Sequence, residues 1–169
     1  WSQAINAGSP LNTKHWETCP SFSPTGDEIY FASNRPGGVG KADIWKCKVQ
    51  ILPNGKLKFS EAVNLGKEVN SPEDEHSPFI HADNQTLYFS SKGREGLGGY
   101  DVFVTYKTPD KKWTTPINIG YPINTCQDEV GFIVNATADK AYFSSDGQED
   151  NGRGRDIYEL DRKSTRLNS

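Results

Sequence analysis

The sequence predicts an all-β protein: three consecutive four-stranded antiparallel blades of an incomplete β-propeller. Two observations carry this prediction. A set of six landmarks occurs three times in the same order, and equivalent tyrosines are spaced 58 and then 54 residues apart, a period that suits a four-stranded blade. The composition, with 34% hydrophobic residues, 16 Gly and 10 Pro in 169 residues, favours short strands joined by tight turns. No heptads or long segments of helical period occur, so few helices are expected.

The clearest landmark is a hexapeptide that ends in Tyr-Phe-small-Ser. Its aromatic pairs are Tyr30 and Phe31, Tyr88 and Phe89, and Tyr142 and Phe143. In a strand with a two-residue period, Ile29 and Phe31 face one way and Tyr30 the other. Both faces are therefore apolar, which predicts that each sheet is sandwiched between neighbouring blades.

The other landmarks delimit the remaining strands. An Asp that precedes a β-branched residue and an aromatic starts the third strand of each copy, expected over about residues 44–49, 102–106 and 157–160. The first strands are expected at 20–23, 78–81 and 132–135. A hairpin turn follows each first strand, with Gly or Asn where φ is positive in two copies, so the turn at Ala138 is predicted to be the least secure.

The copies divide the chain into domains at about 1–58, 59–112 and 113–161, which together form the partial propeller. An apolar-Asn-x-Gly segment, preceded by an aromatic residue, connects one copy to the next. In the first two copies a turn leads into a fourth strand that ends at such an aromatic. Residues 162–169 break the pattern and are interpreted as a disordered or artefactual tail.

Two acidic positions recur in every copy, at Asp43, Asp101 and Asp156 and at Glu17, Glu75 and Glu129. We interpret the aspartates as caps of backbone N–H groups at strand starts, because short carboxylates form such bonds in turns. The glutamates are expected to form ion pairs with Arg35, Arg94 or Arg153. Both sets are thus structural repeat positions, and no catalytic, cofactor-binding or metal-binding residue is predicted.

Several other motifs are too weak to indicate a site. The acidic loop 146–152 lacks the spacing of a calcium loop, and His76 and His81 have no further partners for zinc. The Gly-rich loops 35–40 and 94–99 open no helix and end in no Gly-Lys-Ser/Thr, so they predict no phosphate cradle. No Gly-x-Ser-x-Gly elbow occurs. No cofactor and no enzymatic activity are therefore expected.

The cysteines and the charges bear on the disulfides and the partners that the chain can have. Cys19, Cys47 and Cys126 form no CxxC pair, and we expect buried free thiols, with a Cys19–Cys126 disulfide as the alternative. A formal net charge of −3 with mixed signs indicates no nucleic-acid partner, and no apolar run is long enough for direct membrane insertion. Because the chain starts at Trp1 and contains no Met, we interpret it as a fragment or a processed piece.

The pattern from Pro20 through Ile29-Tyr30-Phe31 to Asp43-Ile44-Trp45 resembles the TolB-type, WD-repeat-like β-propeller repeat. The resemblance covers about residues 1–160. The Asn-x-Gly segments between the blades are similar to those of propellers in large envelope proteins of Gram-negative bacteria, which often carry an OmpA-like domain. This resemblance implies a periplasmic or outer-membrane-associated location and a non-catalytic scaffolding or protein-interaction role.

Three blades are fewer than the roughly four to eight of a closed ring. The expected partners are therefore a protein, missing blades of a parent chain, or a second copy that pairs through open blade edges. Two other functions stay open. The blades could belong to a peptidase of the prolyl-oligopeptidase type, or to a carbohydrate-binding or glycoside-hydrolase propeller in which Trp16 and Trp45 contact sugar.

Overall fold

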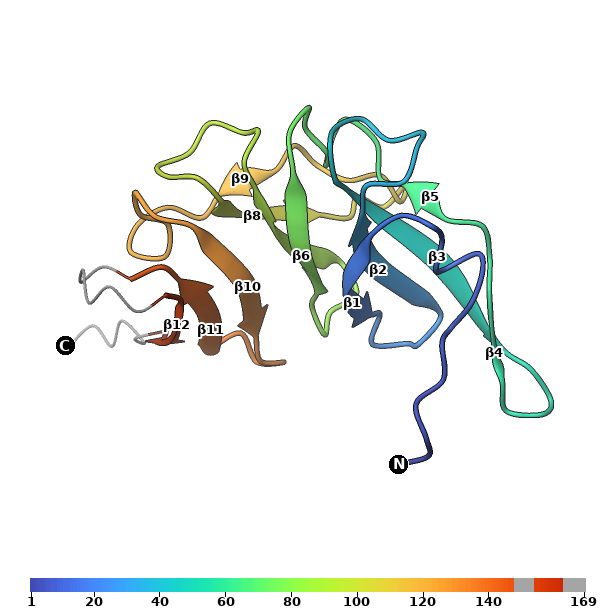
Figure 1. Cartoon of the computed structure of the whole chain (residues 1–169). Coiled ribbons are helices and arrows are strands. Elements are labelled where there is room, and N and C mark those ends of the chain that lie inside the picture. The colour runs from blue at the N-terminus through green and yellow to red at the C-terminus, as the bar shows by residue number, and fades with distance from the viewer. Residues whose placement is uncertain (148–153, 163–169) are drawn as a thin grey trace.

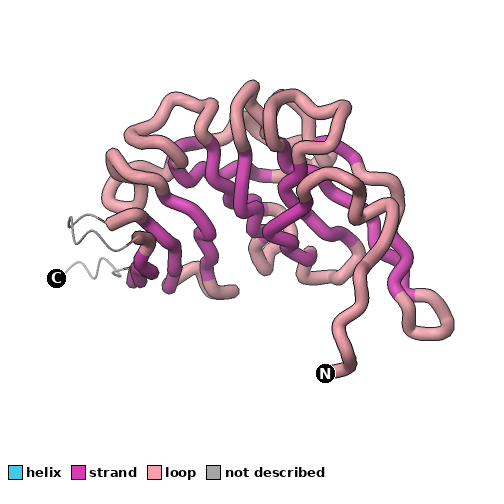
Figure 2. The backbone as a smooth tube through the Cα atoms, in the orientation of Figure 1, coloured by secondary structure: helices cyan, strands magenta, loops and turns pink. Residues whose placement is uncertain are grey.

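The computed structural model describes residues 1–147 and 154–162. Within these residues all regular structure is β-strand, in three antiparallel sheets that stand side by side along an arc (Figure 1). Loops connect the strands and no helix is present among the described residues (Figure 2). No described segment is therefore a helix that could span a membrane. The predicted fold class is confirmed.

Each sheet corresponds to one copy of the repeat. The first blade contains β1 (Glu17–Phe22), β2 (Glu28–Ser33), β3 (Asp43–Ile51), β4 (Leu57–Phe59) and β5 (Val63–Asn64). The second contains β6 (Glu75–Ile80), β7 (Thr86–Ser91), β8 (Asp101–Tyr106) and β9 (Ile117–Asn118). The third contains β10 (Glu129–Val134), β11 (Lys140–Ser145) and β12 (Asp156–Asp161).

The fourth strand differs from its expected form. In the first blade, β4 and β5 both pair with β3, so the Asn-x-Gly segment that connects the copies is itself part of the sheet. In the second blade, Trp113 forms only an isolated bridge with Lys107, and β9 takes the outer position on β8. Each of these two Asn-x-Gly segments thus adds a short strand to the edge of the preceding blade, which explains why its residues recur in every copy. In the third blade the described residues provide no strand beyond β12.

The first strand of each blade begins three residues earlier than expected and contains a bulge. The register between β1 and β2 shifts between Thr18 and Ser21, and equivalent shifts occur in the other two blades. The bulge places Cys19, Ser77 and Gly131 at φ values of 51°, 49° and 69°. Because only Gly adopts this conformation freely, the sequence of the first two copies gave no sign of it.

The hairpin turns follow the prediction. Gly26 and Asn84 have φ values of 72° and 58°, and Ala138 occupies the same position with φ of 54°. Ala138 thus carries a Cβ in a region that disfavours one. The predicted tail begins with Arg162, whose amide donates to Asp139 O at 2.7 Å, while residues 163–169 lie outside the described part of the chain.

Two of the three hydrophobic clusters among the described residues lie between blades, and the third lies on the outer face of the first blade. Tyr30, Ala32 and Ile44 on one face of the first blade pack against Leu87, Phe89 and Phe103 of the second. Ile29 and Phe31 point to the opposite face, where they form a separate cluster with Trp45. The third cluster joins Val102 of the second blade to Phe132, Ala141 and Phe143 of the third. The expectation that each sheet is sandwiched between neighbouring blades holds for the middle blade, whereas among the described residues the first and third blades each have one neighbour.

Candidate functional site: the junctions and the two open blade faces

A buried asparagine joins each pair of blades. The side chain of Asn70 accepts a hydrogen bond from Ile44 N at 2.8 Å and donates one to Ile44 O at 3.1 Å. Asn124 does the same with the backbone of Val102, at 2.8 Å for both bonds. A side-chain amide thus takes the place of one residue of a neighbouring strand. Both asparagines are almost fully buried, so these bonds have no competing water.

A second asparagine shapes the linker that presents the first. Asn64 Oδ1 accepts from Gly66 N at 2.8 Å and from Asn70 Nδ2 at 2.9 Å, and its own Nδ2 donates to Asp43 at 2.9 Å. Asn118 repeats the first two bonds with Gly120 and Asn124. The linker is therefore a rigid loop that fixes Asn70 or Asn124 before it meets the preceding blade.

The recurring aspartates lie where each third strand begins. Asp43 accepts hydrogen bonds from the amides of Val39 and Gly40 at 2.5 and 3.0 Å, and Asp101 accepts them from Leu97 and Gly98 at 3.0 and 3.1 Å. These bonds fold the two Gly-rich loops onto the strand starts. Asp156, in contrast, is exposed. The contacts of Asp43 and Asp101 are those of a structural cap.

The recurring glutamates hold the start of each first strand. Glu75 accepts from Ser71 N at 2.9 Å, from Ser71 Oγ at 2.5 Å and from Ser91 Oγ at 2.7 Å. Glu129 has the corresponding bonds from Thr125 and Ser145. Burial raises the pKa of Glu75 to about 7 against the opposing effect of these donors. The carboxylate oxygens are thus occupied by the scaffold.

The expected ion pairs form in one copy. Arg35 Nη2 lies 3.1 Å from Glu17 Oε1 and also donates to Leu11 O at 2.6 Å. Partial burial opposes ionisation of Glu17, but hydrogen bonds from Thr13 and Ser33 and the charge of Arg35 lower its pKa. Arg94 donates instead to the carbonyls of Glu68 and Val69, at 2.7 and 2.8 Å. The corresponding Arg153 lies outside the described residues.

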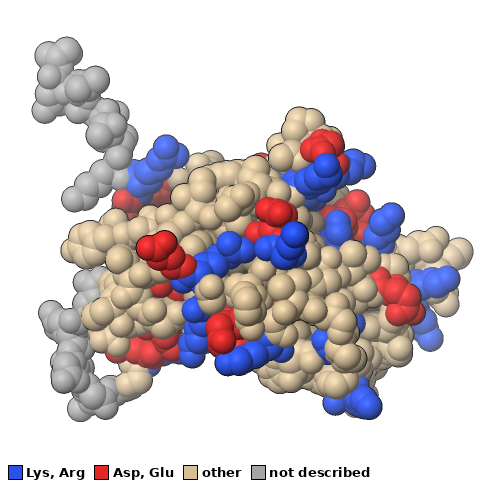
Figure 3. All heavy atoms as spheres, turned by 90° about the horizontal axis from the view of Figure 1, so that it is seen from above, with Lys and Arg blue, Asp and Glu red and all other residues tan. Residues whose placement is uncertain are grey.

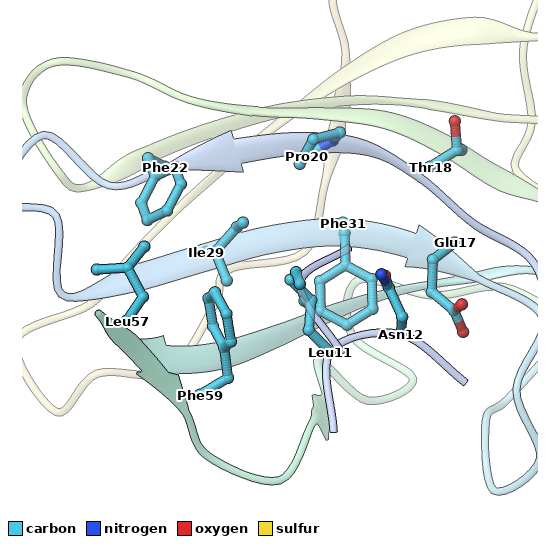
Figure 4. A pocket seen from close by; sticks show the side chains of 11 residues that line it. Leu11, Asn12, Glu17, Thr18, Pro20, Phe22, Ile29, Phe31, Leu57 and Phe59 are labelled. Carbon is cyan, nitrogen blue, oxygen red and sulfur yellow. The ribbon is translucent and has the colours of Figure 1, made fainter. Parts of the chain in front are cut away.

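Among the described residues, the first blade has no neighbouring blade on one face, which we call the head face, although Leu11 and Phe59 of the same copy pack there against Ile29 and Phe31. Side chains of β1, β2, β4 and the segment before β1 line a pocket of about 420 Å³ on it, among them Leu11, Phe22, Ile29, Phe31 and Phe59 (Figure 4). The equivalents of Ile29 and Phe31 in the second blade, Leu87 and Phe89, are covered by the first blade. The head face therefore has the surface of a junction without its neighbour.

Among the described residues, nothing covers the complementary face of the third blade, which we call the tail face. Tyr142 and Ile157 lie on it and are 38% and 77% exposed. Their equivalents in the first blade, Tyr30 and Ile44, are fully buried in the first junction. Each end of the arc thus presents one half of the junction that the chain builds twice internally.

A thiol and an imidazole meet near the innermost strands. Cys19 Sγ lies 3.7 Å from His76 Nδ1 and 3.7 Å from Ser77 Oγ, beside a pocket of about 420 Å³. Hydrogen bonding to His76 lowers the pKa of Cys19 to about 7, although partial burial opposes the shift. Trp16 and Tyr100 flank His76, with ring centroids 5.5 and 6.0 Å away. This cluster could not be recognised from the sequence, because Cys19 and His76 belong to different copies of the repeat.

The cysteines correct one expectation. All three are free, so the Cys19–Cys126 disulfide does not form. Cys47 is buried as expected, but Cys19 is half-buried and Cys126 is exposed, because the loop before the third blade turns it to the surface.

The two tryptophans considered as sugar contacts differ in exposure. Trp45 is buried and donates Nε1–H to Ser33 O at 3.2 Å, so it cannot stack on a sugar, whereas Trp16 is 44% exposed.

The histidines and the acidic loop noted in the sequence do not come together in one site among the described residues. His81 Nε2 lies 3.0 Å from Asn135 O, away from the His76 cluster, and among described residues no three potential ligands gather around a metal position. The acidic loop 146–152 lies mostly outside the described residues. On the face seen in Figure 3, acidic and basic side chains alternate without a large patch of one sign.

The comparisons with known proteins bear on the fold. No protein-family model matches the sequence, and neither does any curated protein. Among solved structures, TolB from Acinetobacter baumannii is similar, with a TM-score of 0.52 and 15% sequence identity over 85% of this chain. The chain has a TolB-like β-propeller fold. It spans 29% of that TolB chain, so the two proteins share an arrangement of blades rather than a length.

Proposed function

We propose that this chain is a non-catalytic protein-interaction or scaffolding module of a bacterial cell-envelope protein, and that its open blade faces are the binding surfaces. The observation that carries the proposal is the apolar pocket on the head face. Its lining residues have the same places in the blade as residues that the chain buries at its own junctions. A surface of this shape suits another β-sheet blade.

The chemistry of the recurring polar residues supports a binding role. The carboxylates of Asp43, Asp101, Glu75 and Glu129 accept hydrogen bonds from the scaffold around them. Groups that hold loops and strands in this way stiffen the blades and leave the apolar faces as the surface free to bind. The periplasmic or outer-membrane-associated setting rests on the resemblance of the repeat to those of envelope propellers.

The proposal is tested by measuring association of the whole chain, which carries both a head face and a tail face. Velocity sedimentation over about a hundredfold range of concentration is expected to show reversible assembly. Phe22→Glu places a charge beside the pocket at a side chain that is 47% exposed, so the chain still folds but associates at least about tenfold more weakly.

The matched control is Ile117→Glu. Ile117 is 58% exposed on β9, although its junction is already formed within the chain, so a charge there is expected to leave assembly unchanged. A chain that stays monomeric throughout the range, or Phe22→Glu and Ile117→Glu with equal effects, would contradict the proposed function.

A further inference from the structure

We propose that two copies of this chain associate head to tail, so that residues 4–12 of each copy dock on the tail face of the other and six blades close into one ring. This inference rests on the proposed function and names the partner of the same surfaces. Three features of the described residues support it: residues 4–12 contact no preceding blade, the outer edge of β12 has no neighbouring strand, and the chain contains two complete junctions of the same kind.

The docking segment is already in its bound shape. Asn6 Oδ1 accepts hydrogen bonds from Gly8 N at 2.8 Å and Asn12 Nδ2 at 3.0 Å, as Asn64 does from Gly66 and Asn70. Among the described residues, however, Asn12 Oδ1 has no hydrogen-bond donor, whereas Asn70 Oδ1 has Ile44 N. Pre-organisation of this kind lowers the entropy cost of association.

The target strand has the matching edge. Ile157 pairs with Ser144 in the register that joins Ile44 to Ala32 and Val102 to Ser90. In those two strands the N–H and C=O of this residue point away from the second strand and bind an asparagine of the next blade. The same groups of Ile157 therefore point to the outer edge of β12, which is unpaired among the described residues.

The apolar surfaces are complementary as well. At the first junction, Tyr30 and Ile44 of one blade cover Leu87 and Phe89 of the next. At the proposed junction, Tyr142 and Ile157 of one copy would lie over the head-face pocket of the other, which Ile29 and Phe31 line while being only 3% and 2% exposed. Phe22 belongs to this contact, since its equivalent Ile80 is 3% exposed. Asn6, equivalent to Asn64, would reach Asp156 as Asn64 reaches Asp43.

The number of copies follows from ring size. A head-to-tail contact joins two different surfaces, so it either closes into a ring or continues as a filament. Closed propellers contain roughly four to eight blades, so two copies of three blades fit this range and three copies do not. Two copies would also give each head face and each tail face a neighbouring blade, so the closed pair is the assembly we propose.

The test compares single variants with their mixture. Phe22→Glu damages the head face and Ile157→Glu damages the tail face, and the exposure of both side chains, 47% and 77%, keeps folding intact. Circular dichroism and thermal unfolding check this, with Ile117→Glu as the control. Wild-type chain is expected to sediment with twice the monomer mass, and each variant alone as a monomer.

Mixing the two variants at equal amounts is expected to restore pairs, because the intact tail face of one meets the intact head face of the other. These pairs are weaker than wild type, since one of two junctions is lost, but at least about tenfold tighter than either variant alone. Asn12→Ala in the wild-type background is expected to weaken pairing as well.

Three outcomes would overturn the inference while leaving the proposed function in place. If Ile157→Glu still pairs as tightly as wild type, the head faces bind each other. If the mixture of Phe22→Glu and Ile157→Glu does not form pairs, the head-to-tail contact is excluded. A wild-type mass other than two copies would exclude the closed ring. A wild-type chain that never associates would instead contradict the proposed function itself.

Discussion

Residues with positive φ recur at fixed places in the repeat, two of which are the bulge of the first strand and the turn that follows it. At the bulge stand Cys19, Ser77 and Gly131, and at the turn Gly26, Asn84 and Ala138. The repeat conserves the backbone conformation at each place and varies the side chain. The turns were predictable because Gly and Asn mark them, whereas Cys and Ser carry no such signal.

Ala138→Gly is expected to stabilise the chain. The substitution removes a Cβ from a residue with φ of 54°, which we expect to raise the free energy of unfolding by about 0.5–1 kcal/mol. Urea denaturation measures the change. The reverse substitution at the equivalent turn, Gly26→Ala, should lower the same quantity by a similar amount, and equal stability of all three proteins would contradict this account.

Cys19 is expected to react with iodoacetamide at a lower pH than an ordinary thiol. The hydrogen bond from His76 stabilises the thiolate and sets its pKa to about 7, compared with about 8.5 for cysteine in peptides. The rate of alkylation, followed for each cysteine by peptide mass spectrometry, should therefore show an inflection near pH 7 at Cys19. His76→Phe should move that inflection upward, and an inflection that does not move would exclude the role of His76.

The strands of each blade are of two kinds. Some can be predicted from the repeat within one copy, and others form only because a neighbouring copy pairs with them. β2, β7 and β11 are recognisable from their Tyr-Phe pairs, which place an apolar side chain on each face of the strand. β5 and β9 are two-residue strands that pair outward, and the sequence identified them only as linkers. Their hydrogen bonds join residues of different copies, so one copy considered alone cannot reveal them.

Asn70→Ala is expected to destabilise the chain and Asn12→Ala is not. Removing the Asn70 amide leaves the buried N–H and C=O of Ile44 without this partner, which should cost about 2–3 kcal/mol in urea denaturation. Asn12 makes a bond only to Asn6 among the described side chains, so in dilute solution its loss should cost less than about 0.5 kcal/mol. Similar losses for both would contradict the junction role of Asn70.

At the scale of the whole molecule, stability is shared among junctions rather than concentrated in one core. Among the described residues, the middle blade packs against a neighbouring blade on both faces and each outer blade on one, and the first blade has a further cluster of its own on its outer face. The sequence predicted this arrangement from the repeat. It could not predict the candidate site, because an open face is defined by which neighbour is missing and not by any residue of its own.

The stability of the whole chain is expected to fall as pH rises from about 4.5 to about 7. Burial raises the pKa of Glu75 to about 7, so the folded state binds this proton more tightly than the unfolded state within that window. The stabilisation is complete below the window and is lost as the carboxyl ionises. Glu75→Gln should flatten the pH dependence of urea denaturation between pH 5 and 7, and an unchanged slope would exclude Glu75 as its source.

The outer hairpin that ends in β4 is where the first two copies of the repeat differ in length. Asp43 and Phe59 are 16 residues apart, while the equivalent Asp101 and Trp113 are 12 apart, so the extra residues of the first copy fall between these landmarks. This hairpin points away from the neighbouring blades (Figure 1). Insertions are therefore tolerated at the rim, and residues 52–56 offer a place to graft a foreign peptide without altering how the blades stack.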